Sequence, residues 1–218
     1  MGMKKNYLIR LEEVEDYSQV ENLTREAFWD VHVPGCDEHY LVHILRDSPA
    51  FIAELDFVLV IDNEIIGNIM YTDAEIINDS GKVYKIITFG PVSILPKYQG
   101  LGYGSLLIKH SLKKASELGY KLVVIYGHPA YYSRLGFVRG EKYDIYSSDG
   151  YYNPALQVFE LSPNALAGVS GSFKEDRVYC LDQEKATEFE AKFPPKEMRK
   201  RPSQQEFQEL ISQRKKRA

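Results

Sequence analysis

The spacing of apolar residues predicts two helices near the start of the chain. Apolar side chains recur at helical spacing over Tyr17–Trp29 and again over Glu38–Arg46, and Pro34 and Gly35 interrupt the pattern between them. Before the first helix, Lys5–Leu11 alternates polar and apolar residues, which predicts a strand. The chain therefore opens with one predicted strand followed by two predicted helices.

The middle of the chain has the pattern of a sheet. Phe57–Ile61 and Ile65–Tyr71 flank a polar turn as the arms of a hairpin, and Glu75–Ile77 extends the second arm. Val83–Leu95 is a third strand region, which Gly90-Pro91 interrupts. The further predicted elements are a helix over Leu106–Leu118, a strand over Leu122–Tyr126, a short helix over Ala130–Leu135 and two strands, Phe137–Val138 and Leu156–Leu161, separated by the polar stretch Tyr143–Asn153. This alternation favours an α/β or α+β fold in which helices pack on a sheet.

The pattern weakens after Ser162, where the chain becomes more polar. Ser203-Gln204-Gln205-Glu206 has the sequence of a capping box and predicts a short C-terminal helix, whose tip, Lys215–Ala218, is expected to fray. Residues 196–218 contain eight Lys or Arg and three Glu, whereas the whole chain has a net charge of −4. A basic tail of this kind binds the acidic body, an anionic partner or nothing, and we expect a solvated tail.

Composition excludes several classes of protein. The 218 residues are 44% hydrophobic and 27% charged, which is typical of a globular protein with a sizeable core. Cys36 and Cys180 lack the spacing of a disulfide framework or a zinc motif, so a reducing cytoplasm is the expected location. No stretch approaches the ~18–20 apolar residues of a membrane span, which predicts no membrane partner. The negative net charge argues against binding of nucleic acid.

The segment with the clearest chemistry is the glycine-rich turn Gln99–Ser105. It follows a predicted strand and opens a predicted helix, so it presents several backbone N–H groups and the positive end of the helix dipole to one point. Such a site holds phosphate or pyrophosphate. The turn is not a dinucleotide fingerprint, because Ser105 stands at the third glycine position, and it lacks the Gly-Lys-Ser/Thr of a Walker loop.

Two motifs together resemble a known family. The pattern Gln-x-x-Gly-x-Gly, read as Gln99, Gly102 and Gly104, resembles the pyrophosphate loop of the GNAT superfamily of N-acetyltransferases. Upstream, Gly90–Pro96 is similar to the family's central strand, and downstream Ala130–Phe137 resembles its second signature, a short helix that carries Tyr and ends in Gly-Phe. The resemblance covers roughly residues 5–161. Within the superfamily, the chain is similar to an uncharacterised bacterial subgroup of predicted acetyltransferases.

This resemblance implies a fold and a domain organisation. The expected fold is a mixed, mostly antiparallel central sheet with splayed central strands, flanked by helices. The expected organisation is a GNAT-like acetyltransferase domain over residues 1–170, followed by a C-terminal extension over residues 171–218 with a short helix and the basic tail.

The resemblance also implies acetyl-CoA as the co-substrate and no metal. The pyrophosphate is expected on the backbone of the turn, and the pantetheine arm is expected to pair with the central strand, where the Val92 amide would polarise the thioester carbonyl. The residues implied in acetyl-CoA binding are Val92, Ile94, Gln99, Gly100, Leu101, Gly102, Tyr103, Gly104 and Ser105.

The implied reaction is direct acetyl transfer to a primary amine in a ternary complex. Tyr132, five residues before Phe137, stands at the family's usual position for the general acid, and a phenol is protonated at pH 7. Its neighbour Tyr131 is expected to point elsewhere. The general base stays open; the weak candidates are Asp73, Glu75 and His128, with Glu38 and His39 on the segment expected to line the acceptor side.

Some alternatives remain open at this point. His32, Cys36, His39 and His43 suggest zinc, but we favour an amphipathic helix, because the Glu of HExxH is absent. A non-catalytic acyl-CoA sensor or an interaction module on the same fold is the alternative function. Gly127-His128-Pro129 departs from the family, in which an Asn often holds the pantetheine. The acceptor is a small-molecule or peptide amine, and the resemblance admits a homodimer.

Overall fold

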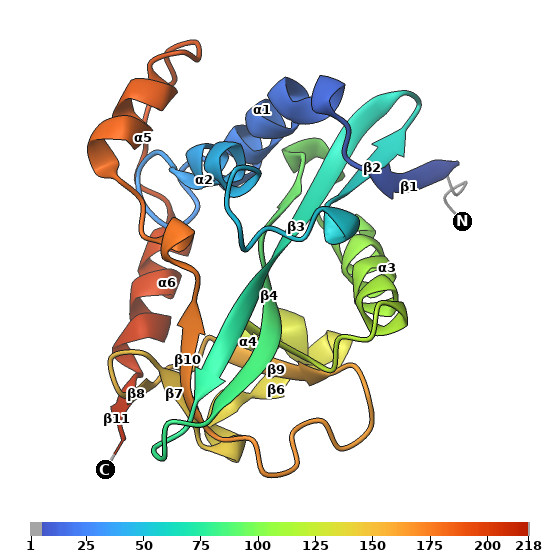
Figure 1. Ribbon diagram of the computed structural model, residues 1–218. Helices are drawn as coiled ribbons and strands as arrows, with labels where there is room; N and C mark the ends of the chain where they lie inside the picture. Colours follow the sequence, from blue (N-terminus) through green and yellow to red (C-terminus); the bar gives the residue numbers. More distant parts are fainter. Residues whose placement is uncertain (1–5, 218) are drawn as a thin grey trace.

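A central sheet of nine strands organises the molecule (Figure 1). The computed structural model describes residues 6–217, so Lys5 and Ala218, the ends of two predicted segments, lie outside the described residues. The strands follow the order β1-β2-β3-β4-β5-β9-β6, and β10 joins both β3 and β7. Their bounds are β1 Tyr7–Leu11, β2 Phe57–Ile61, β3 Glu64–Ile77, β4 Val83–Ile94, β5 Leu122–Tyr126, β6 Val138–Arg139, β7 Ile145–Ser147, β9 Leu156–Glu160 and β10 Gly171–Glu175.

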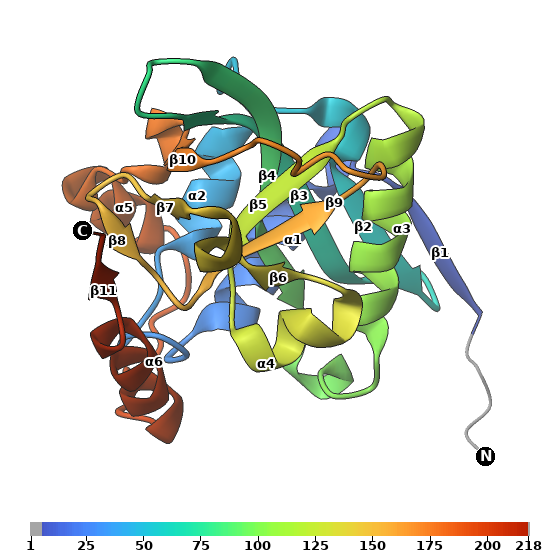
Figure 2. The same cartoon turned by 90° about the horizontal axis from the view of Figure 1, so that it is seen from below.

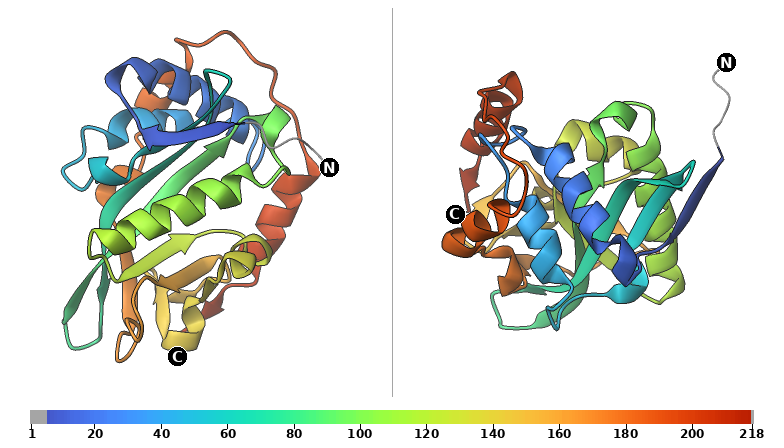
Figure 3. Two further views of the ribbon diagram at one scale, coloured as in Figure 1. Left: turned by 90° about the vertical axis from the view of Figure 1, so that its right-hand side faces the viewer. Right: turned by 90° about the horizontal axis from the view of Figure 1, so that it is seen from above.

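Helices cover both faces of this sheet (Figure 3). α1 (Tyr17–Phe28) and α2 (Glu38–Leu45) lie on one face, and α3 (Tyr103–Glu117) lies on the other. Three helices follow later in the chain: α4 Pro129–Tyr132, α5 Gln183–Glu190 and α6 Pro202–Ser212. The single turns of 3-10 helix are η1 Val14–Asp16, η2 Ala53–Leu55, η3 Pro96–Tyr98, η4 Ser133–Leu135, η5 Gly140–Tyr143 and η6 Arg177–Tyr179. Within residues 6–217, no helix has the length and apolar character to cross a membrane.

Strand alternation divides the core between these two layers of helices. On β3, Tyr71 packs with Leu107 of α3, whereas its neighbour Met70 packs with Val20 of α1 and Leu45 of α2. All five side chains are fully buried, and Tyr71 donates or accepts a 2.8 Å hydrogen bond with Ser111 of α3. The mixed, mostly antiparallel sheet with flanking helices predicted from the sequence is therefore confirmed.

The two central strands diverge soon after they meet. β4 and β5 run parallel but pair at a single position, Ile87 opposite Val123. On its other edge β4 pairs with β3 as far as Ile94, with a shift of register at Gly90-Pro91. The interruption expected at this dipeptide is thus a bulge inside one continuous strand. Beyond Ile87 the edge of β4 that faces β5 has no strand partner among the described residues, so a notch opens between the two strands.

The later part of the chain contributes to the same sheet. β10 pairs antiparallel with the second half of β3 and parallel with β7. The division predicted at residue 170 stays a prediction; Gly171, the next residue, begins β10. An added Cβ at Gly171 would lie 2.3 Å from the Ile77 carbonyl oxygen, so only glycine permits this close approach. The sequence reading missed β7, β10 and α5, because these elements are short and polar.

The basic tail binds the acidic body (Figure 2). β11 (Lys215–Lys216) pairs with β8 (Tyr151–Tyr152), and the Arg217 guanidinium contacts both Asp79 and Asp144 at 2.8 Å. The expectations of a solvated tail and a fraying tip are wrong for the described residues, since ion pairs and strand pairing hold them.

α6 begins differently from the sequence prediction. The predicted capping box at Ser203 does not form. Instead the helix starts at Pro202, with Arg201 at the N-cap and no side-chain cap. Proline suits this first position, because its missing N–H would have had no partner inside the helix.

A buried carboxyl group links β1, β2 and α2. Arg46 holds Glu12 by two hydrogen bonds of 2.8 Å, and the neighbouring Asp56 accepts a 2.9 Å hydrogen bond from Asn68. Burial, followed by the adjacent Glu12 carboxylate, raises the pKa of Asp56 to about 9. Asp56 is therefore protonated in the folded protein at neutral pH, and its proton joins two carboxyl groups that would otherwise repel each other.

This group predicts a stability that depends on pH. Between about pH 4 and pH 9 the folded protein holds a proton on Asp56 that the unfolded chain has released, so the free energy of unfolding falls as pH rises, by at most about 1.4 kcal/mol per unit. Asp56→Asn mimics the protonated form and should weaken this decline, measured by urea unfolding at pH 5, 7 and 9. The exposed control Asp47→Asn should keep the wild-type slope; equal slopes in all three proteins would contradict the assignment.

Candidate active site

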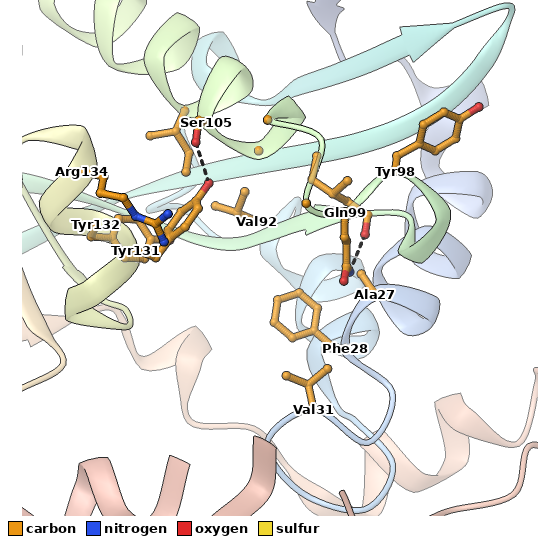
Figure 4. A pocket seen from close by; sticks show the side chains of 15 residues that line it. Ala27, Phe28, Val31, Val92, Tyr98, Gln99, Ser105, Tyr131, Tyr132 and Arg134 are labelled. Atoms are coloured by element: carbon orange, nitrogen blue, oxygen red, sulfur yellow. Dashed lines mark hydrogen bonds between the residues drawn. The ribbon is translucent and has the colours of Figure 1, made fainter. Parts of the chain in front are cut away.

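A cavity of about 530 Å³ opens at the notch between β4 and β5 (Figure 4). Its walls come from the end of α1, the end of β4, the glycine-rich turn before α3, and α4 with the turn after it. Its lining residues are Ala27, Phe28, Val31, Val92, Ile94, Tyr98, Gln99, Gly100, Gly102, Gly104, Ser105, Ile108, Tyr131, Tyr132 and Arg134. Both predicted motifs therefore meet in one cavity, although about thirty residues separate them in the sequence.

The glycine-rich turn forms one wall of the cavity. Gly100 and Gly102 have φ angles of +74° and +91°, a conformation that other residues adopt only with strain, and Gly102 is the N-cap of α3. The first amides of this 15-residue helix have no partners inside the helix, so they are available to a ligand together with the positive end of the dipole. Gln99 anchors the turn, because its Nε2 donates a 2.9 Å hydrogen bond to the Ile94 carbonyl.

Seven of the nine residues predicted to bind acetyl-CoA line this cavity. The other two, Leu101 and Tyr103, lie in the same turn but are not among its lining residues, and the Leu101 side chain is 67% exposed. Leu101 and Tyr103 are expected to contribute through their backbone amides, so the direction of their side chains does not test this prediction.

Tyr131 lines the cavity, which corrects the expectation that it points elsewhere. Its hydroxyl lies 3.3 Å from the Ser105 hydroxyl, so it bridges α4 and the first turn of α3 (Figure 4). The rings of Tyr131 and Tyr132 are perpendicular, with centroids 5.1 Å apart. Two consecutive tyrosines can share one wall because the short helix turns between them. A Cβ at Gly104 would lie 3.0 Å from the Tyr131 hydroxyl, so this glycine leaves room for the bridge.

Tyr132, the predicted general acid, is packed from three sides. Its ring contacts those of Phe137 and Phe89, with centroid distances of 5.3 and 6.1 Å. It also lies directly on the backbone of Gly127, where an added Cβ would come within 2.1 Å of the ring. Burial raises the pKa of the Tyr132 phenol above its ordinary value, so the hydroxyl keeps its proton at neutral pH. The departure Gly127-His128-Pro129 therefore has a structural role here, since Gly127 makes room for the Tyr132 ring.

The structure places the candidate bases away from this cavity. Asp73 and Glu75 line a separate cavity of about 400 Å³ together with Lys85 and Lys174. His128 caps α4, where its side chain accepts a hydrogen bond from the Ala130 amide. His39 is fully buried, and its Nε2 lies 3.0 Å from Glu190 on α5.

Glu38 and the cysteine and histidines around it have local partners. Glu38 pairs with His32 at 3.4 Å, and the Cys36 sulfur lies 3.7 Å from His39. Within the described part of the chain, no group of three or more His, Cys, Asp or Glu is arranged to hold a metal ion.

The sequence reading missed the wall that α1 contributes. Phe28 and Val31 line the cavity, and residues far along the chain hold the segment that carries them. The Trp29 indole donates to the Glu197 carbonyl at 3.0 Å, and Arg25 pairs with Glu190. Arg134 also lines the cavity, and it could have been predicted because it lies inside the second sequence motif. Phe28 lies in no motif, and an apolar residue at the end of an amphipathic helix does not by itself indicate a site.

Comparisons with known proteins agree with this geometry. The sequence profile of the acetyltransferase (GNAT) domain matches residues 47–139. The chain is 31% identical over 165 residues to YhbS, an uncharacterised N-acetyltransferase of Escherichia coli strain K12, and the alignment covers 75% of this chain and 93% of YhbS. The chain belongs to the GNAT family of N-acetyltransferases. This GNAT protein is also 24% identical over 132 residues to YjhQ of the same organism, with 61% of this chain and 70% of YjhQ covered.

Solved GNAT structures share the fold. The crystal structure of E. coli YhbS in complex with CoA superposes with a TM-score of 0.72 and 27% identity, covering 83% of this chain and 96% of YhbS. A GNAT acetyltransferase from Brucella melitensis in complex with acetyl-CoA gives a TM-score of 0.65 and 24% identity, covering 80% of this chain and 99% of its own. The fold predicted from the two motifs is therefore that of the family.

The contact between Gly127 and Tyr132 predicts a specific effect of mutation. Gly127→Ala should lower the free energy of unfolding by about 1–3 kcal/mol, because its Cβ displaces the Tyr132 ring. The same substitution in a Tyr132→Ala background should have a much smaller effect, since the ring is absent. Chemical denaturation of the four proteins in this cycle measures the coupling; additive effects would show that the ring does not rest on Gly127.

Proposed function

We propose that this GNAT protein transfers an acetyl group from acetyl-CoA to a primary amine by direct attack in a ternary complex. The observation that carries the proposal is the glycine-rich turn at the N-terminus of α3, which opens into the cavity at the β4–β5 notch. The complexes of YhbS with CoA and of the Brucella protein with acetyl-CoA support the same ligand here.

The residues of the cavity fit this ligand. Helix amides and glycines without side chains suit a pyrophosphate, and the half-open edge of β4 at Val92 and Ile94 suits an extended arm that carries amides. Arg134 adds a positive charge to the wall, and its Nε donates a 2.9 Å hydrogen bond to the Ala130 carbonyl. Bound acetyl-CoA would supply an activated acyl group on a thiol leaving group.

The chain's own groups then have two tasks. The Val92 amide would donate a hydrogen bond to the thioester carbonyl and stabilise the negative charge that develops on its oxygen. The Tyr132 hydroxyl gives its proton to the departing sulfur, and its raised pKa keeps that proton available at neutral pH. The proposed acceptor is a small-molecule or peptide amine. The resemblance to the GNAT superfamily also allows a homodimer, which stays a prediction.

Calorimetric titration with acetyl-CoA tests the binding site. Wild-type protein should bind, and Gly102→Glu should lose binding, because bulk and negative charge then occupy the anion site. Gly119→Glu is a matched control: Gly119 ends the same helix segment with a φ of +90° and nothing within 4 Å, so it imposes the same backbone strain far from the turn. Absence of acetyl-CoA binding to folded wild-type protein would overturn the proposal. Equal loss of binding in Gly102→Glu and Gly119→Glu would exclude the glycine-rich turn as the binding site.

Replacement of Tyr132 separates catalysis from binding. Tyr132→Phe should leave the affinity for acetyl-CoA within about twofold and lower kcat for amine acetylation by about 10²-fold or more, since the proton donor is lost. Release of the free CoA thiol measures turnover over a panel of primary amines. A wild-type protein that binds acetyl-CoA but acetylates none of them would favour the acyl-CoA sensor instead.

A further inference from the structure

One charged side chain lies on the wall of the cavity at the β4–β5 notch. Among the described residues that line this cavity, only Arg134 carries a charge, and the others are apolar residues, glycines or neutral polar residues. Arg134 belongs to η4, the single turn after α4, which Gly136 ends with a φ of +95°. The residue is exposed, so it lies where the cavity opens to solvent. A cation at an otherwise uncharged opening attracts an anionic part of a ligand.

The contacts of Arg134 hold its guanidinium in place without neutralising it. Its Nε donates a 2.9 Å hydrogen bond to the Ala130 carbonyl, and its Cζ lies 5.8 Å from the centre of the Tyr131 ring (Figure 4). Its terminal nitrogens make no hydrogen bond or ion pair with any residue between 6 and 217, whereas Arg25 and Arg46 are paired with carboxylates. A planar fork of N–H donors held in this way is available to a phosphate group.

Tyr131 connects Arg134 to the glycine-rich turn. Its ring contacts the guanidinium, and its hydroxyl lies 3.3 Å from the hydroxyl of Ser105 in the first turn of α3. The free amides of α3 and the cation of Arg134 therefore belong to two neighbouring walls of one cavity and are carried by different elements. A ligand with two separate anionic groups can contact both walls at once.

Acetyl-CoA has two such groups, the pyrophosphate and the 3′-phosphate on its ribose. The N-terminus of a helix supplies about half a positive charge, whereas a phosphate monoester carries about −1.5 to −2 charges near pH 7. A turn that holds the pyrophosphate therefore leaves the 3′-phosphate uncompensated, and a chain with a net charge of −4 does not attract it. If the thioester reaches inward to Val92, the adenosine end stays near the opening, where Arg134 lies.

We infer that Arg134 binds the 3′-phosphate of acetyl-CoA and makes the protein distinguish CoA from its 3′-dephosphorylated form. This inference rests on the proposed function and adds a specificity-determining residue to its acetyl-CoA site. The guanidinium donates two parallel N–H bonds to the phosphate oxygens. The Tyr131 ring and the Ala130 carbonyl fix the side chain in advance, which reduces the entropy lost on binding.

Calorimetric titration with CoA and with 3′-dephospho-CoA tests this subsite. Wild-type protein should bind CoA about tenfold or more tightly than 3′-dephospho-CoA, because the second ligand lacks the charge-assisted contact. Arg134→Gln should lose this preference: its affinity for CoA falls by about the same factor, and its affinity for 3′-dephospho-CoA changes by less than about twofold. Arg134→Lys keeps the charge without the fork and should bind CoA with intermediate affinity.

Arg139→Gln is the matched control for the change in charge. Arg139 is also exposed, but it lines a different cavity together with Glu141 and Tyr152. This variant should keep the wild-type preference for CoA. The inference is overturned if wild type binds both ligands equally, if Arg139→Gln loses the preference as Arg134→Gln does, or if Arg134→Gln weakens both ligands by the same factor. The last result would assign Arg134 to the pyrophosphate instead.

Steady-state kinetics give an independent readout. The 3′-phosphate is remote from the thioester, so its contact is the same before and during the reaction. Arg134→Gln should therefore raise KM for acetyl-CoA about tenfold or more and leave kcat within about twofold. With acetyl-3′-dephospho-CoA, the variant and wild type should have the same KM. A lowered kcat with an unchanged KM would contradict the inference, because it would give Arg134 a role in the chemical step.

Failure of this inference differs from failure of the proposed function. If folded wild-type protein binds neither CoA nor 3′-dephospho-CoA, the proposed function fails before Arg134 is tested. If wild type binds both with one affinity, the acetyl-CoA site stands and Arg134 is excluded from it. Unchanged affinity of Arg134→Gln for 3′-dephospho-CoA shows that the variant is folded and that its loss is confined to the 3′-phosphate.

Discussion

The divergence of β4 and β5 is the constraint on which the site depends. Parallel pairing at Ile87 and Val123 holds the strands together at one level, and the sheet then splits. β4 keeps its pairing with β3, so one wall of the notch is rigid, while β5 ends and leads into α4. The split lets the glycine-rich turn, the tyrosine helix and the end of α1 meet around one cavity. A fully paired sheet would have filled this space with backbone.

The parts of the site that sequence predicted are those encoded by local patterns. The turn at Gly102 and the helix that carries Tyr132 each need a few consecutive residues of particular shape, so a motif shows them directly. Strands and helices with clear periodicity, such as β5 and α1, were also placed to within a residue or two. The error at Tyr131 came from treating a one-turn helix as if neighbouring side chains must face opposite ways.

The rest depends on contacts between residues far apart in the sequence. β10 becomes a strand because β3 and β7 accept it, and neither its length nor its polarity indicates this. The tail was misjudged similarly: its charge was visible, but the acidic residues that bind Arg217, Asp79 and Asp144, lie on two segments far from it in the sequence.

Residues near the C-terminus hold α1 in place, and this affects the order in which the fold forms during synthesis. Arg25 is separated by 165 residues from Glu190, its partner in the finished fold. A ribosome that adds roughly 5–20 residues per second needs about 10–30 s to bridge that interval. During this time the wall that carries Phe28 lacks its support, although the strands of the notch are already present. A nascent chain would acquire its sheet first and a closed substrate chamber last.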